Sequence, residues 1–147
     1  MTNSRVPNIL SIAGTDPTGG AGIQADLKSI AAAGGYGMCV VTSLVAQNTQ
    51  GVREIHTPPQ NFLRAQLAAV FDDVDVDAVK IGMLGDAETT RTVSEFLSAN
   101  SVPVIVVDPV MVATSGDRLL TEDAEEALRQ FVRDHASVVT PNIPELA

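Results

Sequence analysis

The chain has very little cysteine and no long apolar run. Its one cysteine, Cys39, has no partner for an internal disulfide and lies in an apolar, strand-like stretch, so we expect a small buried side chain rather than a reactive thiol. Such sparing use of cysteine is typical of a reducing compartment, and we expect a cytoplasmic protein. The first apolar segment, residues 9–13, is short and runs into glycines, which predicts neither a signal peptide nor a membrane span.

Positive charge is also scarce. The sequence has 9 Lys and Arg residues against 18 Asp and Glu residues, a net charge of −9, and its only lysines are Lys28 and Lys80. A surface that follows a nucleic-acid backbone needs clustered basic residues, so we expect no nucleic-acid partner. At 147 residues and 45% hydrophobic composition, the chain suits one globular domain, residues 1–147, able to bury its own core.

Familiar nucleotide and metal motifs are missing as well. No G-x-x-x-x-G-K-[ST] is present, which excludes a P-loop. Residues 20–25 satisfy G-x-G-x-x-A in form, but they start too far from the preceding strand, and no acid follows at the expected distance. His56 and His135 have no partner at ligand spacing, so we assign neither to a metal nor to catalysis.

What the chain does have is a glycine-rich segment, residues 14–26, directly after the first apolar run. Its four glycines let the backbone adopt positive φ and approach a ligand closely. From Gly22 apolar residues recur at helical spacing, so the segment ends at a helix N-terminus, where N–H groups attract polar ligand atoms. We predict a loop that binds a small organic molecule; a plain strand-to-helix connection is the weaker alternative.

Strand-like and helix-like segments alternate along the rest of the chain. Further apolar, β-type runs are expected at residues 38–45, 78–83, 102–107 and 136–140. The run at 102–107 is apolar on both faces, as in a parallel strand covered by helices on both sides. Residues 47–51 have turn composition, 52–56 suit a short edge strand, and Asp86 and Thr121 are expected helix caps. The alternation predicts an α/β fold with a mostly parallel sheet flanked by helices.

In such sheets ligands bind beyond the carboxyl ends of the strands, so the residues after each strand are the informative ones. Gln47 offers a donor and an acceptor suited to the edge of a heteroaromatic ring, with a plain turn residue as an equal alternative. Met83 suits either a flexible pocket wall or the core. Lys80 lies inside an apolar strand, and we expect a strand-end lysine whose ammonium reaches solvent.

Polar side chains also follow the last two strands. Asp108 comes directly after residues 102–107, and Asn142 and Glu145 follow residues 136–140. Together they could orient a hydrated divalent cation, because oxygen ligands and retained water are what Mg²⁺ prefers. Taken singly, each is better explained as a helix cap or a turn residue.

At these positions the sequence resembles the hydroxymethylpyrimidine/phosphomethylpyrimidine kinases of thiamine biosynthesis, members of the ribokinase-like superfamily. The resemblance runs from about Ile9 to the last residue. It is carried by five segments in order, residues 13–26, 45–49, 80–83, 108–111 and 140–145. It implies a ribokinase-like fold that is truncated before its carboxy-terminal part.

The resemblance also implies roles for individual residues. The substrate-binding residues would be Ala21, Asp26, Val45, Gln47, Met83 and Val110, with Gln47 bonding the ring. Those on the ATP and phosphate side would be Asp108, Asn142 and Glu145, the last two as Mg²⁺ ligands through water.

The implied activity is transfer of the γ-phosphoryl group of ATP to 4-amino-5-hydroxymethyl-2-methylpyrimidine and then to its monophosphate. In that family the glycine-rich anion hole and most of the nucleotide-base pocket belong to the part beyond Ala147. We therefore expect no catalytic residue within this chain and little turnover by it alone. Two other functions stay open, a non-catalytic pyrimidine-binding module and a kinase for pyridoxal-type substrates. If the chain ends at Ala147, an exposed sheet edge and apolar face predict poor solubility or self-association as a homo-oligomer.

Overall fold

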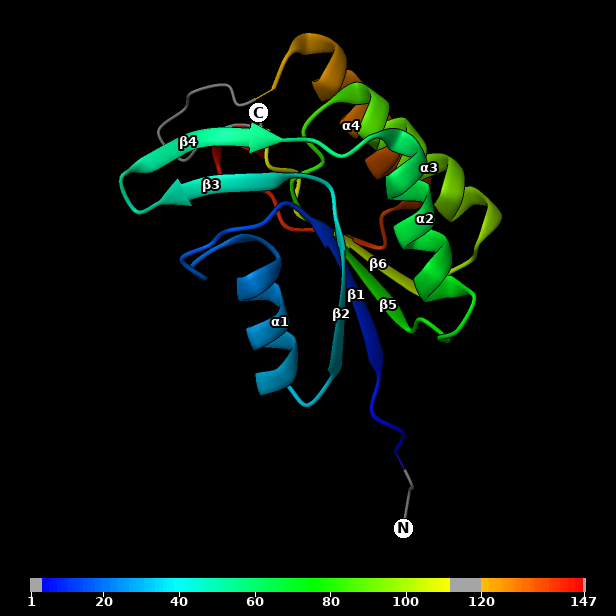
Figure 1. Ribbon diagram of the computed structural model, residues 1–147. Coiled ribbons are helices and arrows are strands. Elements are labelled where there is room, and N and C mark those ends of the chain that lie inside the picture. The colour runs from blue at the N-terminus through cyan, green and yellow to red at the C-terminus, as the bar shows by residue number, and fades with distance from the viewer. Residues whose placement is uncertain (1–3, 112–119, 147) are drawn as a thin grey trace.

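A five-stranded parallel sheet forms the centre of the molecule (Figure 1). The computed structural model describes residues 4–111 and 120–146. The strand order is β2-β1-β5-β6-β7, and all four pairings are parallel. The strands are β1 (Asn8–Ala13), β2 (Tyr36–Val41), β5 (Ala78–Ile81), β6 (Val104–Val107) and β7 (Val138–Val139). The predicted α/β fold with a mostly parallel sheet is confirmed.

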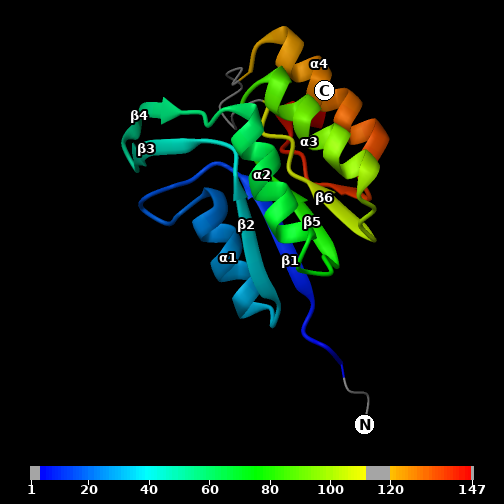
Figure 2. The same ribbon diagram turned by 45° about the vertical axis from the view of Figure 1, so that its right-hand side comes forward.

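Helices cover the two faces of this sheet unequally (Figures 1 and 2). Among the described residues, one face carries only α1 (Gly22–Ala32), which packs on β1 and β2. The other carries α2 (Gln60–Phe71), α3 (Ala87–Ala99) and α4 (Glu122–His135). Right-handed crossovers explain the division, because the chain steps one way from β1 to β2 and the other way from β5 to β7.

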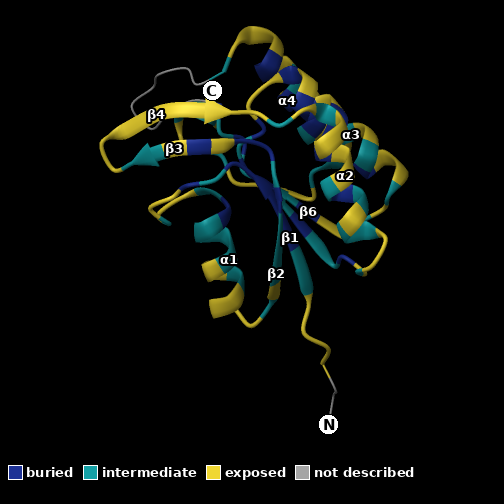
Figure 3. Cartoon of the chain, in the orientation of Figure 1, coloured by how far each residue is buried: buried dark blue, intermediate teal, exposed yellow. Residues whose placement is uncertain are grey.

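The hydrophobic core lies between the sheet and the three-helix layer (Figure 3). Neighbouring strands supply inward side chains in register, as Leu10 pairs with Val79 and Val79 with Ile105. From the helices, Leu67, Val93 and Phe131 pack against them, among other apolar residues. Burying such side chains contributes about 1.5–3 kcal/mol each, which makes this layer the main source of stability.

The opposite face of β6 is more open than the sequence predicts. Ile105 and Val107 are buried beneath the three-helix layer, but Val104 on the other face is 40% exposed and Val106 is only half-buried. The expectation of helices on both sides of residues 102–107 is therefore wrong for the described part of the chain. The physical reason is that α1, the helix on that face, lies over β1 and β2 instead.

The predicted strand at residues 38–45 is two strands. β2 stays in the parallel sheet, while β3 (Leu44–Asn48) leaves it to form an antiparallel hairpin with β4 (Gly51–His56). The break falls at Thr42, which is 1% exposed and whose hydroxyl donates to the Met83 carbonyl at 2.7 Å. This bond holds the chain at the sheet edge while it turns. Residues 52–56 are confirmed as a strand, whereas Gln47 and Asn48 end β3 and do not form the predicted turn.

The two predicted helix caps differ. Asp86 caps α3, since its Oδ1 accepts from the Thr89 N–H at 2.7 Å. Thr121 occupies the N-cap position of α4, but its hydroxyl donates to Asp123 Oδ1 at 2.5 Å and makes no bond to the helix backbone. Within residues 4–111 and 120–146, no helix has both the length and the apolar character needed to cross a membrane.

Candidate functional site

A pocket of about 250 Å³ lies at the carboxyl ends of β1, β5 and β6, and Gln47 of the β3–β4 hairpin forms part of its lining. Five of the predicted site residues line it: Ala21, Gln47, Met83, Asp108 and Val110. They come from the glycine loop, the hairpin and the segments after two strands, so the fold brings together what the sequence scatters. The volume suits one small ring with its substituents.

The glycine loop folds back on its own strand at the start of α1. The Ile23 N–H donates to the Gly14 carbonyl at 3.0 Å, and Gly22 has a φ of +58°. A Cβ at residue 22 would lie 2.5 Å from the Gly14 oxygen, so only glycine fits here. This closure brings Ala21 and the helix N-terminus to the pocket wall.

Asp16 holds the loop in shape from inside. Its Oδ1 accepts from the N–H and the hydroxyl of Thr18 at 2.9 and 2.8 Å, and its Oδ2 accepts from the N–H groups of Gly20 and Ala21 at 3.1 and 2.8 Å. The bond from the Thr18 hydroxyl lowers the pKa of Asp16 most, against an opposing effect of burial. No separate role for Asp16 was predicted from the sequence, although a carboxylate two residues before Thr18 has the spacing of an Asx turn.

Gln47 reaches the pocket from an irregular point of the hairpin, where the register of β3 against β4 shifts between Ala46 and Gln47. Its side chain lies near the Asp16 carboxylate and is the smallest of several causes of the lowered pKa of Asp16. The plain-turn alternative for Gln47 is wrong because the residue is in β3.

Val110 stands out in the pocket wall by its backbone. Its φ of +36° lies in the left-handed region, where a β-branched residue is strained. The next residue is held in place, since the Met111 N–H donates to Glu145 Oε1 at 2.8 Å. Strain of this kind clusters where a side chain must take a particular position, and here it puts Val110 on the pocket wall.

Two of the predicted substrate residues lie behind the wall. Val45 is 4% exposed, and its N–H donates to the Thr15 hydroxyl at 2.9 Å, which ties the hairpin to the glycine loop. The Asp26 side chain does not line the pocket. Its Oδ2 accepts from the Ser11 hydroxyl at 2.7 Å and from the Lys80 ammonium at 3.0 Å. Both residues therefore support the pocket wall from behind.

Lys80 is the pocket residue for which the prediction from the sequence was wrong. We expected a strand-end lysine reaching solvent, but its ammonium pairs with Asp26, and its side chain is only 28% exposed and lines the pocket. The usable signal was its place in an apolar strand, where a lysine is stable only if paired. The partner, 54 residues away in the sequence, could not be identified from spacing.

Asp108 is the second charged residue of the pocket wall. Burial raises its pKa above 3.8, Lys80 lowers it, and the nearby carboxylates of Glu145 and Asp26 raise it further. Desolvation and like charge together outweigh the one ammonium, so this corner of the site is electrostatically suited to a cation.

Asn142 and Glu145 lie beside this corner, in the segment after β7. Glu145 Oε2 accepts from the Asn142 N–H at 3.0 Å, and Asn142 Oδ1 accepts from the Glu145 N–H at 3.0 Å, so each side chain holds the other's backbone. With the Met111 bond, Glu145 ties this segment to the loop after β6. No cluster of three His, Cys, Asp or Glu side chains suited to a metal is found among residues 4–111 and 120–146. These oxygens fit a hydrated Mg²⁺ better than a fully liganded one.

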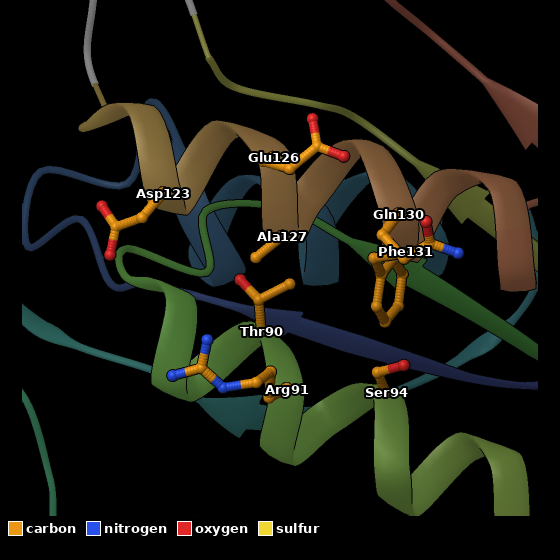
Figure 4. A pocket seen from close by; sticks show the side chains of 8 residues that line it. All are labelled: Thr90, Arg91, Ser94, Asp123, Glu126, Ala127, Gln130 and Phe131. Atoms are coloured by element: carbon orange, nitrogen blue, oxygen red, sulfur yellow. The ribbon is translucent and has the colours of Figure 1, made fainter.

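A larger hollow of about 440 Å³ lies between α3 and α4 (Figure 4). Arg91 projects from α3 and Asp123 from α4, and Phe131 forms part of the floor. The lining comes entirely from these two helices, away from the carboxyl ends of the strands. None of the predicted site residues lines it, so the smaller pocket is the better candidate for function.

Comparison with known proteins identifies the family of the chain. A family model described as phosphomethylpyrimidine kinase matches residues 16–147. The thiamine biosynthesis multifunctional protein ThiED of Corynebacterium glutamicum is 69% identical over 147 residues, which cover 100% of this chain and 19% of that protein. The hydroxymethylpyrimidine/phosphomethylpyrimidine kinase of Salmonella typhimurium is 51% identical over 140 residues, 95% of this chain and 53% of that protein.

Solved structures show the same relationship. The phosphomethylpyrimidine kinase of Clostridium difficile 630 superposes with a TM-score of 0.91 at 45% identity, over 95% of this chain and 60% of that one. A pyridoxal kinase from Staphylococcus aureus in complex with AMP-PCP has a TM-score of 0.84 at 34% identity, over 97% and 51%. The chain therefore spans about half the length of these separate kinases and 19% of the ThiED protein. From the family match over residues 16–147 and this shared ribokinase-like fold, the chain belongs to the phosphomethylpyrimidine kinase family.

Proposed function

We propose that this chain forms the acceptor site of a kinase that phosphorylates 4-amino-5-hydroxymethyl-2-methylpyrimidine and its monophosphate in thiamine biosynthesis, with ATP as donor. The observation that carries the proposal is the pocket at the strand ends, where the Gln47 amide lies between the apolar side chains of Met83 and Val110. The family relationship of residues 16–147 supports the same substrate class.

The pocket matches an aminopyrimidine in shape and polarity. Met83 and Val110 supply apolar surface for the faces of a ring. The amide of Gln47 presents a donor and an acceptor side by side. An aminopyrimidine edge has the complementary pair, an exocyclic amine beside a ring nitrogen. The Ala21 region and the N-terminus of α1 close the pocket, and Val45 and Asp26 support the wall from behind.

ATP and Mg²⁺ belong to the other side of the proposed site. Asp108, Asn142 and Glu145 gather there, and carboxylates outnumber cations around Asp108. Polyphosphate could approach such a corner only with a cation, and Asn142 and Glu145 would hold Mg²⁺ through water. When bound, Mg²⁺ neutralises charge on the transferring phosphoryl group. The chain's own contribution is to position the acceptor and to exclude water from it.

The experiment is a calorimetric titration of the protein with the hydroxymethylpyrimidine. We expect replacement of Gln47 by Ala to weaken binding about tenfold, the loss of one or two ring hydrogen bonds. Gln50→Ala is the matched control, because Gln50 is exposed at the turn of the same hairpin. Equal affinity of wild type and Gln47→Ala would contradict the assignment of Gln47.

Phosphoryl transfer is measured separately, by ³¹P NMR with ATP and Mg²⁺, in the natural polypeptide that carries this sequence. Formation of the monophosphate and then the diphosphate is the expected result. Tight pyrimidine binding with no transfer in that polypeptide would favour a non-catalytic binding module.

A kinase for pyridoxal is the second candidate. The observation that favours it is the superposition on pyridoxal kinases, including one solved with pyridoxal and AMP-PCP at a TM-score of 0.82. Pyridoxal also has a single ring with polar substituents and could occupy the same pocket. Titration with pyridoxal under identical conditions separates the two, since the preferred substrate binds more tightly and loses affinity when Gln47 is replaced.

A further inference from the structure

A lysine that lines the pocket and two side chains behind it form a connected polar group on the α1 face of the sheet. Ser11 in β1 and Lys80 in β5 are direct partners in the parallel register, so their side chains point to the same face. Asp26 reaches them from α1, and its Oδ2 accepts from both, at 2.7 Å from the Ser11 hydroxyl and 3.0 Å from the Lys80 ammonium. We define Ser11, Asp26 and Lys80 as the Lys80 support.

The Lys80 support is rigid and mostly shielded from water. Ser11 is 0% exposed, and the side chains of Asp26 and Lys80 are 17% and 28% exposed. A flexible lysine on a surface would lose conformational freedom when it binds a ligand, whereas this one is already held. The ammonium is therefore preorganised before any ligand arrives.

The backbone leaves room for the ammonium at the pocket. Residue 82 is glycine, and a Cβ there would lie 3.1 Å from Lys80 Nζ and 2.8 Å from the Ala13 Cβ. Any larger residue would press on the ammonium or on the neighbouring strand. Lys80 and Gly82 both line the pocket, so the space that glycine provides is part of the pocket itself.

The ammonium has unused donor capacity on the pocket side. It carries three N–H groups, and among the described residues Asp26 is its one hydrogen-bond acceptor. The charged residues that line the pocket are Lys80 and Asp108, and only Lys80 is positive. A partly desolvated cation with spare donors in a small pocket is suited to an anionic oxygen.

We propose that the Lys80 ammonium, positioned by Asp26 and Ser11, binds a phosphoryl oxygen of a phosphate monoester seated in this pocket. The proposal rests on the proposed function and deepens it, because it makes Lys80 the residue that favours the pyrimidine monophosphate over the unphosphorylated alcohol. Asp26, which the resemblance placed on the ring, becomes a positioning residue that acts through Lys80.

The chain offers a direct probe, because Lys28 and Lys80 are its only lysines. Protein labelled with ¹³C and ¹⁵N at lysine gives two side-chain signals, assigned by Lys28→Met. Lys28 is exposed, donates to the Gly19 carbonyl at 2.6 Å and does not line the pocket. Its signal therefore reports on effects unrelated to binding in the pocket. We expect the pyrimidine monophosphate to shift the Lys80 signal strongly, the alcohol to shift it little, and Lys28 to stay in place. A Lys80 signal that moves only with ATP would overturn the proposal and assign the ammonium to the nucleotide.

Affinity gives a second readout. Lys80→Met should lower the ratio of monophosphate to alcohol affinity at least tenfold, the usual effect of a lost charge-assisted hydrogen bond. Lys28→Met should leave the ratio unchanged. Lys80→Met leaves the Asp26 carboxylate unpaired and could impair folding, so the Asp26→Asn/Lys80→Met double variant removes both charges together. Ser11→Ala should lower the ratio by a smaller factor.

The outcomes separate this proposal from the proposed function. If both pyrimidines bind and the ratio is the same in wild type and in the folded double variant, Lys80 does not bind the phosphate, although the pocket assignment stands. If the wild type binds neither pyrimidine, the proposed function and the phosphate site both fail.

Discussion

Asp16 is the residue whose side chain does most to shape the site. It accepts hydrogen bonds from three backbone N–H groups and one hydroxyl, all within the glycine loop. The Gln47 side chain of the hairpin lies near it and contributes slightly to its lowered pKa. A loop with this many glycines has a large conformational entropy when unfolded, and one carboxylate offsets part of that cost by satisfying several donors at once.

We therefore expect Asp16→Ala to lower the melting temperature by roughly 5 °C, since it leaves several donors of the loop without an acceptor. Asp73→Ala, at an exposed acid after α2, should change it by less than about 1 °C and serves as the control. Thermal unfolding followed by circular dichroism measures both. Equal melting temperatures for the two variants would show that the loop does not depend on Asp16.

The pH dependence of this contribution follows from the lowered pKa of Asp16. A carboxyl whose pKa is lower in the folded state stabilises the fold fully above the unfolded value of 3.8, and loses that contribution as pH falls through the lowered pKa. The difference in free energy of unfolding between the wild type and Asp16→Asn should therefore become smaller as pH falls below 3.8.

At the scale of single elements, helix α3 has the N-cap that its local sequence predicts. Its N-cap, Asp86, accepts from the Thr89 N–H, as the sequence predicts. Thr121 occupies the corresponding N-cap position of α4, yet its hydroxyl bonds to Asp123 instead. A hydroxyl can donate to a nearby carboxylate, whereas a carboxylate can only accept, so the aspartate cap is the more predictable of the two.

Replacing Asp86 by Ala should lower the free energy of unfolding by about 1 kcal/mol through loss of the cap. Asp86→Asn keeps an acceptor at the same position and should cost at most a few tenths of that, about 0.3 kcal/mol. Urea denaturation at pH 7 compares the variants. The cap explanation fails if the Asn variant is as unstable as the Ala variant.

At the scale of the whole molecule, the two faces of the sheet differ in cover. The face under α2, α3 and α4 is buried, while Val104 and Val138 on the α1 side are 40% and 50% exposed. The exposed strand β7 forms the edge next to β6. An apolar surface beside an open strand edge favours contact with a second copy of the chain.

For the 147-residue chain taken by itself, we expect sedimentation velocity to show association that grows with protein concentration. A variant with Val104→Thr and Val138→Thr should raise the dissociation constant roughly tenfold, because it replaces apolar surface with polar surface. Val6→Thr, at an exposed valine before β1, should have no effect. A wild-type monomer at high concentration would contradict the expectation.

Much of the fold was predictable from neighbours in the chain. Apolar runs, the glycine loop and the Asp86 cap are local patterns, and their alternation led to the parallel sheet and to one functional edge. Ala21, Gln47, Met83, Asp108 and Val110 were placed at that edge correctly, because parallel strands end together. The split at Thr42 was missed, since an apolar run does not show where a chain leaves one sheet for another.

The features of the site that sequence patterns could not predict depend on contacts between distant residues. The pairing of Lys80 with Asp26 spans 54 positions and requires β5 to lie beside β1 with α1 above them. The left-handed Val110 and the place of Gln47 in the pocket depend likewise on packed neighbours. Periodicity and turn chemistry act over a few residues, so they determine the elements and their order. The charge and shape of the pocket arise only once those elements are packed together.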